Sequence, residues 1–215
     1  MARPPASVPT VPARKPRLSR QERKTQTRAS LIEIGRQHIL RDGLGDAVAE
    51  RIAEEAGFSR GAFYGNFADK EDLFLAIVKD DQESRFHLVR TILESHEPAG
   101  ILVKRLREAV AERVTDPDWI SLEAEFEAGA LRSEKIRQTY IELYRNMLKD
   151  SRRILNKLVQ QPGIQFALPP SEFLMVMLSF AHGLAVSQRL LGSELSVKKT
   201  RKLIYTVFDR LLATK

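Results

Sequence analysis

Residues 52–67 hold the side chains whose types and spacing could do chemistry. Among them, Gly57-Phe58-Ser59-Arg60-Gly61 matches G-x-S-x-G, the sharp turn that exposes the nucleophilic serine of α/β-hydrolases. That chemistry needs a strand before the serine, an oxyanion loop and a histidine later in the chain. The residues before Ser59 have helical periodicity, and no glycine-rich oxyanion loop is visible. A serine hydrolase is therefore the alternative prediction, not the main one.

The same stretch fits two short helices joined by a three-residue turn that contains Gly57, which is the pattern of a helix-turn-helix. The residues able to form an apolar seam between the two helices are Ile52, Ala56, Phe58, Phe63 and Phe67. On a helix, Gly61 and Gly65 fall on the side opposite Phe63 and Phe67, so the outward face is nearly bare. A bare face lets the backbone approach another surface closely, and the first residues of such a helix can reach base edges in a DNA major groove.

Helical periodicity continues on both sides of this stretch, and no run alternates with the period of a strand. The first helix is expected from about Ser19 to Gly43, the second over 47–56 with Asp46 as its N-cap, and the third from Ser59 to about Phe67. A long fourth helix is expected to begin at Asp69. The remaining helices are expected at 99–114, 117–130, 133–160, 170–191 and 196–213, separated by proline or glycine. The predicted fold class is all-α, with about nine helices.

The net charge of +7 is concentrated at the N-terminus, because residues 1–28 hold eight basic side chains and one acid. The other 187 residues are neutral overall, and residues 42–72 are acidic, with three basic side chains against eight acids. A basic arm fused to a balanced body is typical of proteins that bind polyanions such as DNA. Residues 1–17 contain five of the ten prolines and are expected to be disordered.

Other features of the composition exclude several kinds of site. The chain has no cysteine, so it has no disulfide, thiolate zinc site or thiol nucleophile. The four histidines lack metal-ligand spacing, and no metal or cofactor is predicted. The longest nearly apolar stretch, 173–186, is shorter than the ~20 residues that span a bilayer, and the basic N-terminus leads into prolines rather than a signal-peptide core. No membrane partner is predicted.

The helix-turn-helix resembles that of the TetR family of bacterial transcriptional regulators, whose signature is close to I-A-x-x-A-G-V-S-x-G-x-x-Y-x-H-F-x-x-K-x-x-L. In the register of this pattern, the chain has Ile52, Ala53, Ala56, Gly57, Phe58, Ser59, Gly61, Tyr64, Asn66, Phe67, Lys70 and Leu73. Residues 21–75 match in detail and the rest matches more loosely. The chain departs from the family where Asn66 replaces a frequent His and where Ala47 and Val48 replace a Thr pair.

The resemblance implies roles for six residues at the DNA. Tyr64, Asn66 and Lys70 correspond to phosphate contacts, while Ser59 and Gly61 permit close approach. Because Gly65 removes a side chain that many relatives point at DNA, base reading depends on Arg60, which can pair with guanine O6 and N7.

The resemblance also implies that 18–68 is the DNA-binding domain and 69–215 a regulatory and dimerisation domain that binds a small molecule. The expected dimer interface uses the last two helices through Phe173, Met177, Phe180, Leu184, Leu203, Val207 and Leu211. The expected ligand pocket is lined by Trp119, Glu123, Phe126, Tyr140 and Tyr144. For both sets, packing inside one chain is the open alternative.

Together these features predict a homodimeric, cytoplasmic, nucleoid-associated regulator, not an enzyme. It is expected to repress a gene by binding a palindromic operator and to be released by a small-molecule inducer. A helical scaffold that binds protein rather than DNA is the other open alternative, and it would show no salt-sensitive binding to such a DNA.

Overall fold

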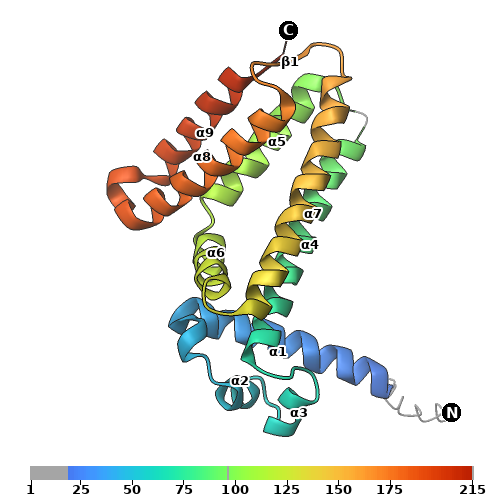
Figure 1. Ribbon diagram of the computed structural model, residues 1–215, viewed down its shortest axis with the longest axis vertical. Coiled ribbons are helices and arrows are strands. Elements are labelled where there is room, and N and C mark those ends of the chain that lie inside the picture. Colours follow the sequence, from blue (N-terminus) through green and yellow to red (C-terminus); the bar gives the residue numbers. More distant parts are fainter. Residues whose placement is uncertain (1–18, 96, 215) are drawn as a thin grey trace, which may run out of the picture.

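The computed structural model describes residues 19–95 and 97–214, which form nine α-helices, one short 3-10 helix and two strands (Figure 1). The helices are α1 Arg20–Asp46, α2 Ala49–Glu55, α3 Arg60–Tyr64, α4 Lys70–Glu94, α5 Ala99–Val114, α6 Pro117–Ala130, α7 Glu134–Val159, α8 Pro170–Leu191 and α9 Val197–Leu211. The 3-10 helix η1 spans Gly192–Leu195, and the strands are β1 Ile164–Phe166 and β2 Leu212–Thr214. The predicted all-α fold is confirmed. The expected disordered arm, 1–17, lies outside the described residues.

Short polar side chains begin several helices where the sequence predicts them. Ser19 and Glu22 form a reciprocal capping box at the start of α1, in which the Ser19 Oγ accepts from the Glu22 amide at 3.1 Å. Asp69 caps α4 by accepting from the Asp72 amide at 2.8 Å. Each such cap satisfies a backbone donor that has no partner inside the helix.

The junction between α1 and α2 differs in part from the prediction. Gly43 interrupts α1 with φ +79°, a left-handed conformation that glycine adopts without steric cost, so the predicted break occurs there. Helical turns then continue to Asp46. The expected cap by Asp46 is wrong, because α2 begins at Ala49 and its N-cap position, Val48, makes no side-chain cap.

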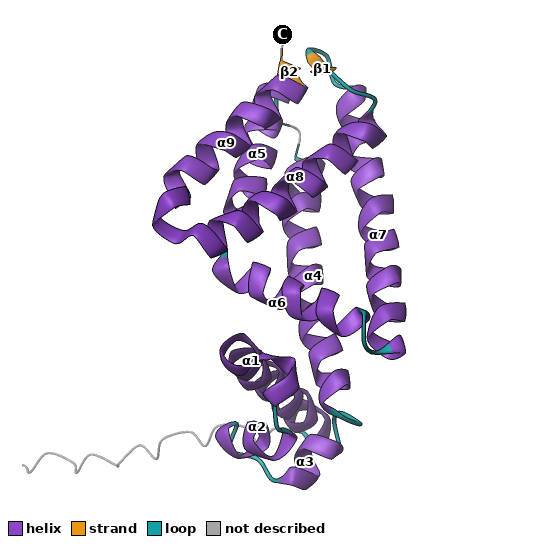
Figure 2. Ribbon diagram, turned by 60° about the vertical axis from the view of Figure 1, so that its left-hand side comes forward, coloured by secondary structure: helices purple, strands orange, loops and turns teal. Residues whose placement is uncertain are grey.

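The helices are arranged in a small N-terminal unit and a larger group that extends away from it. The first three helices form the N-terminal unit at one end of the molecule, and α4 and α7 run side by side away from it (Figure 1). Helix α6 lies between that unit and the group formed by α5, α8 and α9, and Figure 2 shows the same arrangement after rotation. The described part of the N-terminal end and the C-terminus thus lie at opposite ends.

The core of the N-terminal unit continues into the C-terminal helices. One buried cluster contains Leu31, Ile52, Phe63, Phe67, Leu73, Phe74, Phe126 and Ile136, which come from the first four helices, α6 and α7 and from the turn after α3. Here α1 and α4 touch closely, because a Cβ built on Gly35 would lie 2.6 Å from the Leu73 Cδ2. Two further clusters hold α5, α8 and α9 together.

The strands β1 and β2 were not expected from the sequence. They pair antiparallel with Ile164 opposite Thr214 and Phe166 opposite Leu212. With three residues each, they are too short to display the alternation that marks a strand in a sequence.

Helix α8 has an unusual surface for a helix that also carries core residues. With η1 it forms a segment, Pro170–Leu195, that by length and composition is long and apolar enough to cross a membrane, which the shorter 173–186 stretch is not. Only 11% of its most apolar window is buried. Its exposed apolar side chains include Met175, Val176 and Leu190, and Leu190 is 78% exposed. Such a face is typical of a surface that another chain covers.

Candidate functional site

The turn between α2 and α3 is built by backbone hydrogen bonds around one glycine. The Gly57 amide donates to the Glu54 carbonyl at 2.9 Å, and the Phe58 amide donates to the Ala53 carbonyl at 2.8 Å. Gly57 has φ +77°, where a side chain would be strained. This turn places Ser59 at the N-cap position of α3.

Ser59 caps α3, at the start expected for the third helix. Its Oγ accepts a hydrogen bond from the Ala62 amide at 3.2 Å. The element that precedes it is helix α2, whereas a nucleophile elbow requires a strand. The geometry therefore gives the serine-hydrolase alternative no support. Among the described residues, no group of three potential ligands could hold a metal ion.

One face of α3 packs and the other is open. Phe63 and Phe67 are buried, as the seam predicted, and their rings lie 5.7 Å apart. On the open side Gly61 and Gly65 are exposed, and 44% of Tyr64 is accessible. This open side is a strip of backbone bounded by a long basic side chain, Arg60, and an aromatic ring.

In the free protein, the Arg60 side chain already contacts two other residues. Its side chain is 70% exposed, and its Nε lies 3.2 Å from the Glu50 Oε1 of α2. Its guanidinium also lies 5.4 Å from the centre of the Tyr64 ring. Pairing Arg60 with a base therefore requires it to leave a carboxylate.

The other two predicted phosphate contacts are turned toward the protein. The Asn66 Nδ2 donates to the Ala62 carbonyl at 2.8 Å, and the Lys70 Nζ donates to the Gly45 carbonyl at 2.6 Å. Lys70 thereby ties the start of α4 to the last turn of α1. Both side chains must change partner before they can reach a phosphate.

Arg28 joins α1 to this surface, a role that the six residues selected from the sequence do not include. Its Nη1 donates to the Asn66 carbonyl at 3.1 Å, and its guanidinium lies 4.4 Å from the centre of the Phe67 ring. Four exposed basic residues of α1 are Arg20, Arg23, Lys24 and Arg28. The basic composition of 1–28 is the sequence signal for this extension.

In the C-terminal helices, four of the five expected pocket residues come together. Phe126 of α6 and Tyr140 of α7 have ring centres 5.0 Å apart, and Tyr140 stacks parallel to Tyr144 at 6.2 Å. Burial raises the pKa of Tyr140 to about 12, with smaller contributions from the negative charges of Glu123 and Glu127. These two carboxylates therefore lie near the Tyr140 phenol.

The expected set missed two members of this group and contained one residue that lies elsewhere. Glu127 follows Glu123 by one helical turn, and its Oε2 lies 3.7 Å from the His182 Nε2 of α8. Trp119 instead packs with α5 and α8, under the Arg113 guanidinium at 4.4 Å. We refer to the group as the acidic–aromatic cluster, which consists of Glu123, Phe126, Glu127, Tyr140, Tyr144 and His182.

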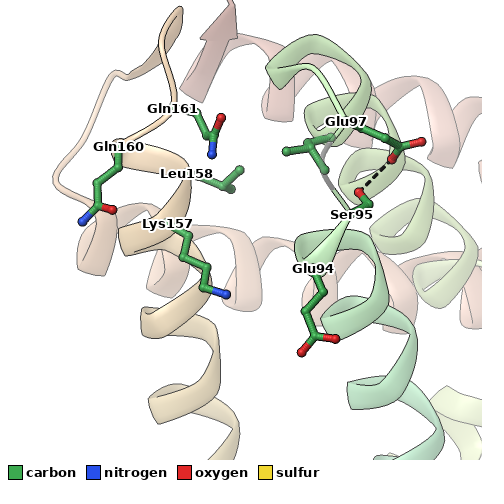
Figure 3. A pocket seen from close by; sticks show the side chains of 8 residues that line it. Glu94, Ser95, Glu97, Lys157, Leu158, Gln160 and Gln161 are labelled. Atoms are coloured by element: carbon green, nitrogen blue, oxygen red, sulfur yellow. Dashed lines mark hydrogen bonds between the residues drawn. The ribbon is translucent and has the colours of Figure 1, made fainter.

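A separate cavity of about 490 Å³ opens at the end of α4 and α7 farthest from α3 (Figure 3). It is lined by Glu94, Ser95, Glu97, Leu102, Lys157, Leu158, Gln160 and Gln161, none of which the sequence had suggested. Ser95 donates to Glu97 at 3.0 Å, and Arg105 pairs with the same carboxylate at 2.6 Å. The Glu97 carboxylate that lines this cavity is thus already paired with Arg105 of the same chain.

The expected dimer residues divide into two groups. Phe173, Met177 and Leu184 are buried in the core of the single chain and are unavailable to a partner. Phe180, Val207 and Leu211 are partly buried, and Leu203 is 38% exposed. The more exposed apolar residues of α8, described above, were not in the expected set.

The fold and this surface define a helix-turn-helix protein with a larger helical domain attached. A family model described as bacterial regulatory proteins, tetR family, matches residues 31–77, which cover α2, α3 and parts of α1 and α4. Over these residues the chain is similar to the TetR family.

Among curated relatives, the regulator TtgR of Pseudomonas putida is 33% identical over 97 residues, which are 44% of this chain and 46% of TtgR. The repressor AcnR of Corynebacterium glutamicum is 26% identical over 136 residues, which are 62% of this chain and 65% of AcnR. The chain thus spans about half the length of the first of these relatives. Both names describe regulators of transcription, not enzymes.

Solved structures extend the likeness of fold to the C-terminal helices. A transcriptional regulator from Saccharomonospora viridis in complex with choline superposes with a TM-score of 0.76 at 18% identity, over 89% of this chain and all of that one. Reduced NemR of Escherichia coli gives a TM-score of 0.74 at 17% identity, over 88% of this chain and 98% of NemR. A complex of SmeT with triclosan gives 0.70 at 16% identity, over 88% of this chain and 92% of SmeT.

Proposed function

We propose that this protein is a TetR-family repressor that binds a palindromic operator as a dimer and is released by a small molecule. The observation that carries the DNA-binding part is the open face of α3, on which exposed Arg60, Gly61 and Tyr64 surround bare backbone. A helix with this profile can enter a major groove without steric conflict. Arg60 then reads a guanine, and Ser59, Gly61 and Gly65 allow the close approach.

Phosphate attraction in this proposal comes from α1 rather than from the helix-turn-helix. Residues 42–72 carry a net negative charge, whereas the exposed N-terminal part of α1 is basic. Arg28 lies against Asn66 and Phe67 at the end of the recognition helix, so the basic turns of α1 adjoin the proposed groove contact. Tyr64, Asn66 and Lys70 add phosphate contacts after the last two exchange their internal acceptors.

Dimerisation in this proposal uses the uncovered face of α8 and the adjoining part of α9. Met175, Val176, Leu190 and Leu203 present apolar side chains to solvent, with exposures between 38% and 78%. Two copies of α8 and α9 can bury these side chains as a four-helix bundle. This assignment also explains why α8 is apolar on more than one side, without a membrane partner.

The acidic–aromatic cluster is the proposed inducer site. It joins α6, α7 and α8, and α6 also contacts α1 in the DNA-binding domain. Two neighbours of the same fold are complexes with choline and with triclosan, which supports a small-molecule ligand for a protein of this fold. A ligand that binds better to one arrangement of α6 shifts the protein toward that arrangement and so changes the separation of two recognition helices. The proposed location is the cytoplasm, at the nucleoid.

The test is footprinting on the DNA that flanks the protein's own gene, followed by gel shifts with the protected fragment. We expect a protected palindrome, and we expect Arg60→Ala to weaken binding to it more than to random DNA. Arg132→Ala, which removes an exposed arginine outside the proposed interface, is the matched control. Absence of salt-sensitive binding to any flanking fragment would favour the protein-binding scaffold instead.

A further inference from the structure

The cavity between the ends of α4 and α7 is separate from the proposed inducer site. Its lining residues come from the end of α4, the start of α5, the segment between them and the end of α7 (Figure 3). Along α7, Lys157 lies about 20 Å beyond Tyr144 of the acidic–aromatic cluster, at about 1.5 Å per residue. The volume of about 490 Å³ falls in the range of roughly 300–1,000 Å³ that is usual for small-molecule sites.

One wall of the cavity is apolar and fixed by the core. Leu102 of α5 and Leu158 of α7 line it, and these side chains are only 3% and 1% exposed. Both belong to a buried cluster that holds the C-terminal helices together. The wall is therefore already formed, and it can receive the apolar group of a ligand without a change in the core.

Two opposite charges lie on different walls of this cavity. Lys157 extends from the last turn of α7 toward α4, and Glu94, the last residue of α4, lies opposite it (Figure 3). Both side chains are exposed. Within the described ranges of the chain, neither of them makes an ion pair. One ammonium and one carboxylate are thus available to a ligand, each from a different helix.

The remaining charge at the rim is already balanced. Glu97 accepts a hydrogen bond from Ser95 and pairs with Arg105 at 2.6 Å. The hydrogen bond from Arg105, followed by that from Ser95, lowers the pKa of the Glu97 carboxyl below its usual value. Glu97 therefore stays ionised and held by Arg105. The Gln161 amide, which points into the cavity in Figure 3, adds both a donor and an acceptor.

We propose that this cavity binds a zwitterion with an apolar side chain, such as an apolar amino acid or a short peptide with both ends charged. Its ammonium lies near Glu94, and its carboxylate lies near Lys157 and the Gln161 amide. Its apolar group lies on Leu102 and Leu158. A ligand with a single charge pairs with only one of the two charged side chains. A zwitterion pairs with both, and it thereby joins the end of α4 to the end of α7.

Isothermal titration calorimetry on the full chain without DNA compares ligands of nearly the same shape and different charge. The probes are leucine and alanyl-leucine. Each is also used as its N-acetyl form, which keeps only the carboxylate, and as its C-terminal amide, which keeps only the ammonium. We expect at least one zwitterion to bind about threefold or more tightly than both of its blocked forms, because each blocked form loses one ion pair.

Two variants test the assignment of each charge. Glu94→Gln should remove the preference for the zwitterion over its N-acetyl form and keep the preference over its amide. Lys157→Met should do the reverse, and a general loss of structure would not produce such opposite results. Circular dichroism checks that both variants fold. Glu83→Gln and Lys149→Met, at exposed positions of α4 and α7 outside the cavity, are the matched controls and should keep both preferences.

The proposal is overturned if neither zwitterion binds more tightly than both of its blocked forms, or if Glu94→Gln and Lys157→Met keep the preferences of the wild type. A loss of preference in Lys149→Met as large as that in Lys157→Met would also overturn it, because the effect would then come from the overall charge of α7. Since no DNA is present in the titration, its result does not depend on the proposed function.

Discussion

The Glu125 carboxylate of α6 accepts a hydrogen bond from the backbone amide of Leu44, 3.1 Å away in α1. That amide follows directly on Gly43, where α1 is interrupted and the helical hydrogen-bond ladder is broken. Glu125 thus supplies an acceptor to the break in α1, while Glu123 and Glu127 of the same helix belong to the acidic–aromatic cluster. One helix therefore touches both the DNA-binding domain and the proposed inducer site.

Replacing Glu125 tests this connection. Glu125→Ala removes the acceptor and leaves the part-buried Leu44 amide unpaired, so we expect a loss of about 1–2 kcal/mol in the free energy of unfolding. Glu125→Gln keeps an acceptor oxygen and should lose less than half of that. Urea denaturation monitored by circular dichroism measures both. Equal losses for the two variants would show that the charge, not the acceptor, matters.

The packing of α1 against α4 leaves no room at Gly35. A methyl group there would meet the buried Leu73 side chain at 2.6 Å, so Gly35→Ala should destabilise the protein by about 1–3 kcal/mol. Gly45→Ala is the control in the same helix, because a Cβ there meets no atom within 4 Å. Thermal melts should show a lower Tm for the first variant only, and a Tm for Gly35→Ala equal to that of Gly45→Ala would contradict the close packing.

The Arg60–Glu50 ion pair predicts opposite effects for its two members. Glu50→Gln removes a negative charge beside the proposed DNA surface and releases Arg60, so it should raise affinity for operator and random DNA alike, by about two- to fivefold. Arg60→Ala should reduce the difference in binding free energy between operator and random DNA by about 1–3 kcal/mol. Fluorescence anisotropy with operator DNA and with random DNA measures the affinity of each variant for both. Weaker binding of both DNAs by Glu50→Gln would mean that this pair positions Arg60 for DNA.

Deleting residues 1–17 removes four basic side chains and none of the residues that build the described helices. We expect lower affinity for all DNA and an unchanged base preference. The slope of log affinity against log salt should become shallower by up to about 0.9 for each phosphate that the arm neutralises in the full chain. A slope identical to that of the full chain would make the arm a passive tail.

Acid should weaken the tie between α4 and α7. Lys135 pairs with Asp69 and Asp72, and its hydrogen bond to Asp72, together with the Ala68 amide, lowers the pKa of that carboxyl from its ordinary 3.8. A lowered pKa adds stability above the unfolded-state value, and that stability is lost as the pH falls through the folded-state value. Lys135→Met should therefore lower the Tm near neutral pH and make a shrinking difference below about pH 4. A Tm difference that is constant from pH 7 to pH 3 would exclude the ion pair as its cause.

Local chemistry explains what the sequence could predict. Helices are expected to start at residues 59, 69 and 196, and a start of this kind needs only a polar side chain and a nearby amide. Ser59, Asp69 and Ser196 each cap a helix there. The two faces of α3 follow from helical periodicity alone. The break at Gly43 follows from the backbone freedom of glycine.

The features that the sequence did not predict depend on partners far apart in the chain. Periodicity identifies α8 as apolar but cannot tell which apolar residues face the core, so the expected interface includes buried Met177 and omits exposed Val176. The inward hydrogen bond of Lys70 depends on where α1 ends, and the ion pair of Glu127 with His182 depends on how α6 meets α8. No local pattern carries such information.

The uncovered apolar face of α8 has a consequence for how such a regulator responds to its own abundance. In the proposed dimer, two chains must meet before both halves of an operator can be contacted at once. At low copy number, operator occupancy then rises with the square of the chain's concentration, so a modest change in expression produces a larger change in repression. The chain concentration at which the proposed dimer forms depends on the side chains of α8. These side chains belong to a different part of the fold from α3.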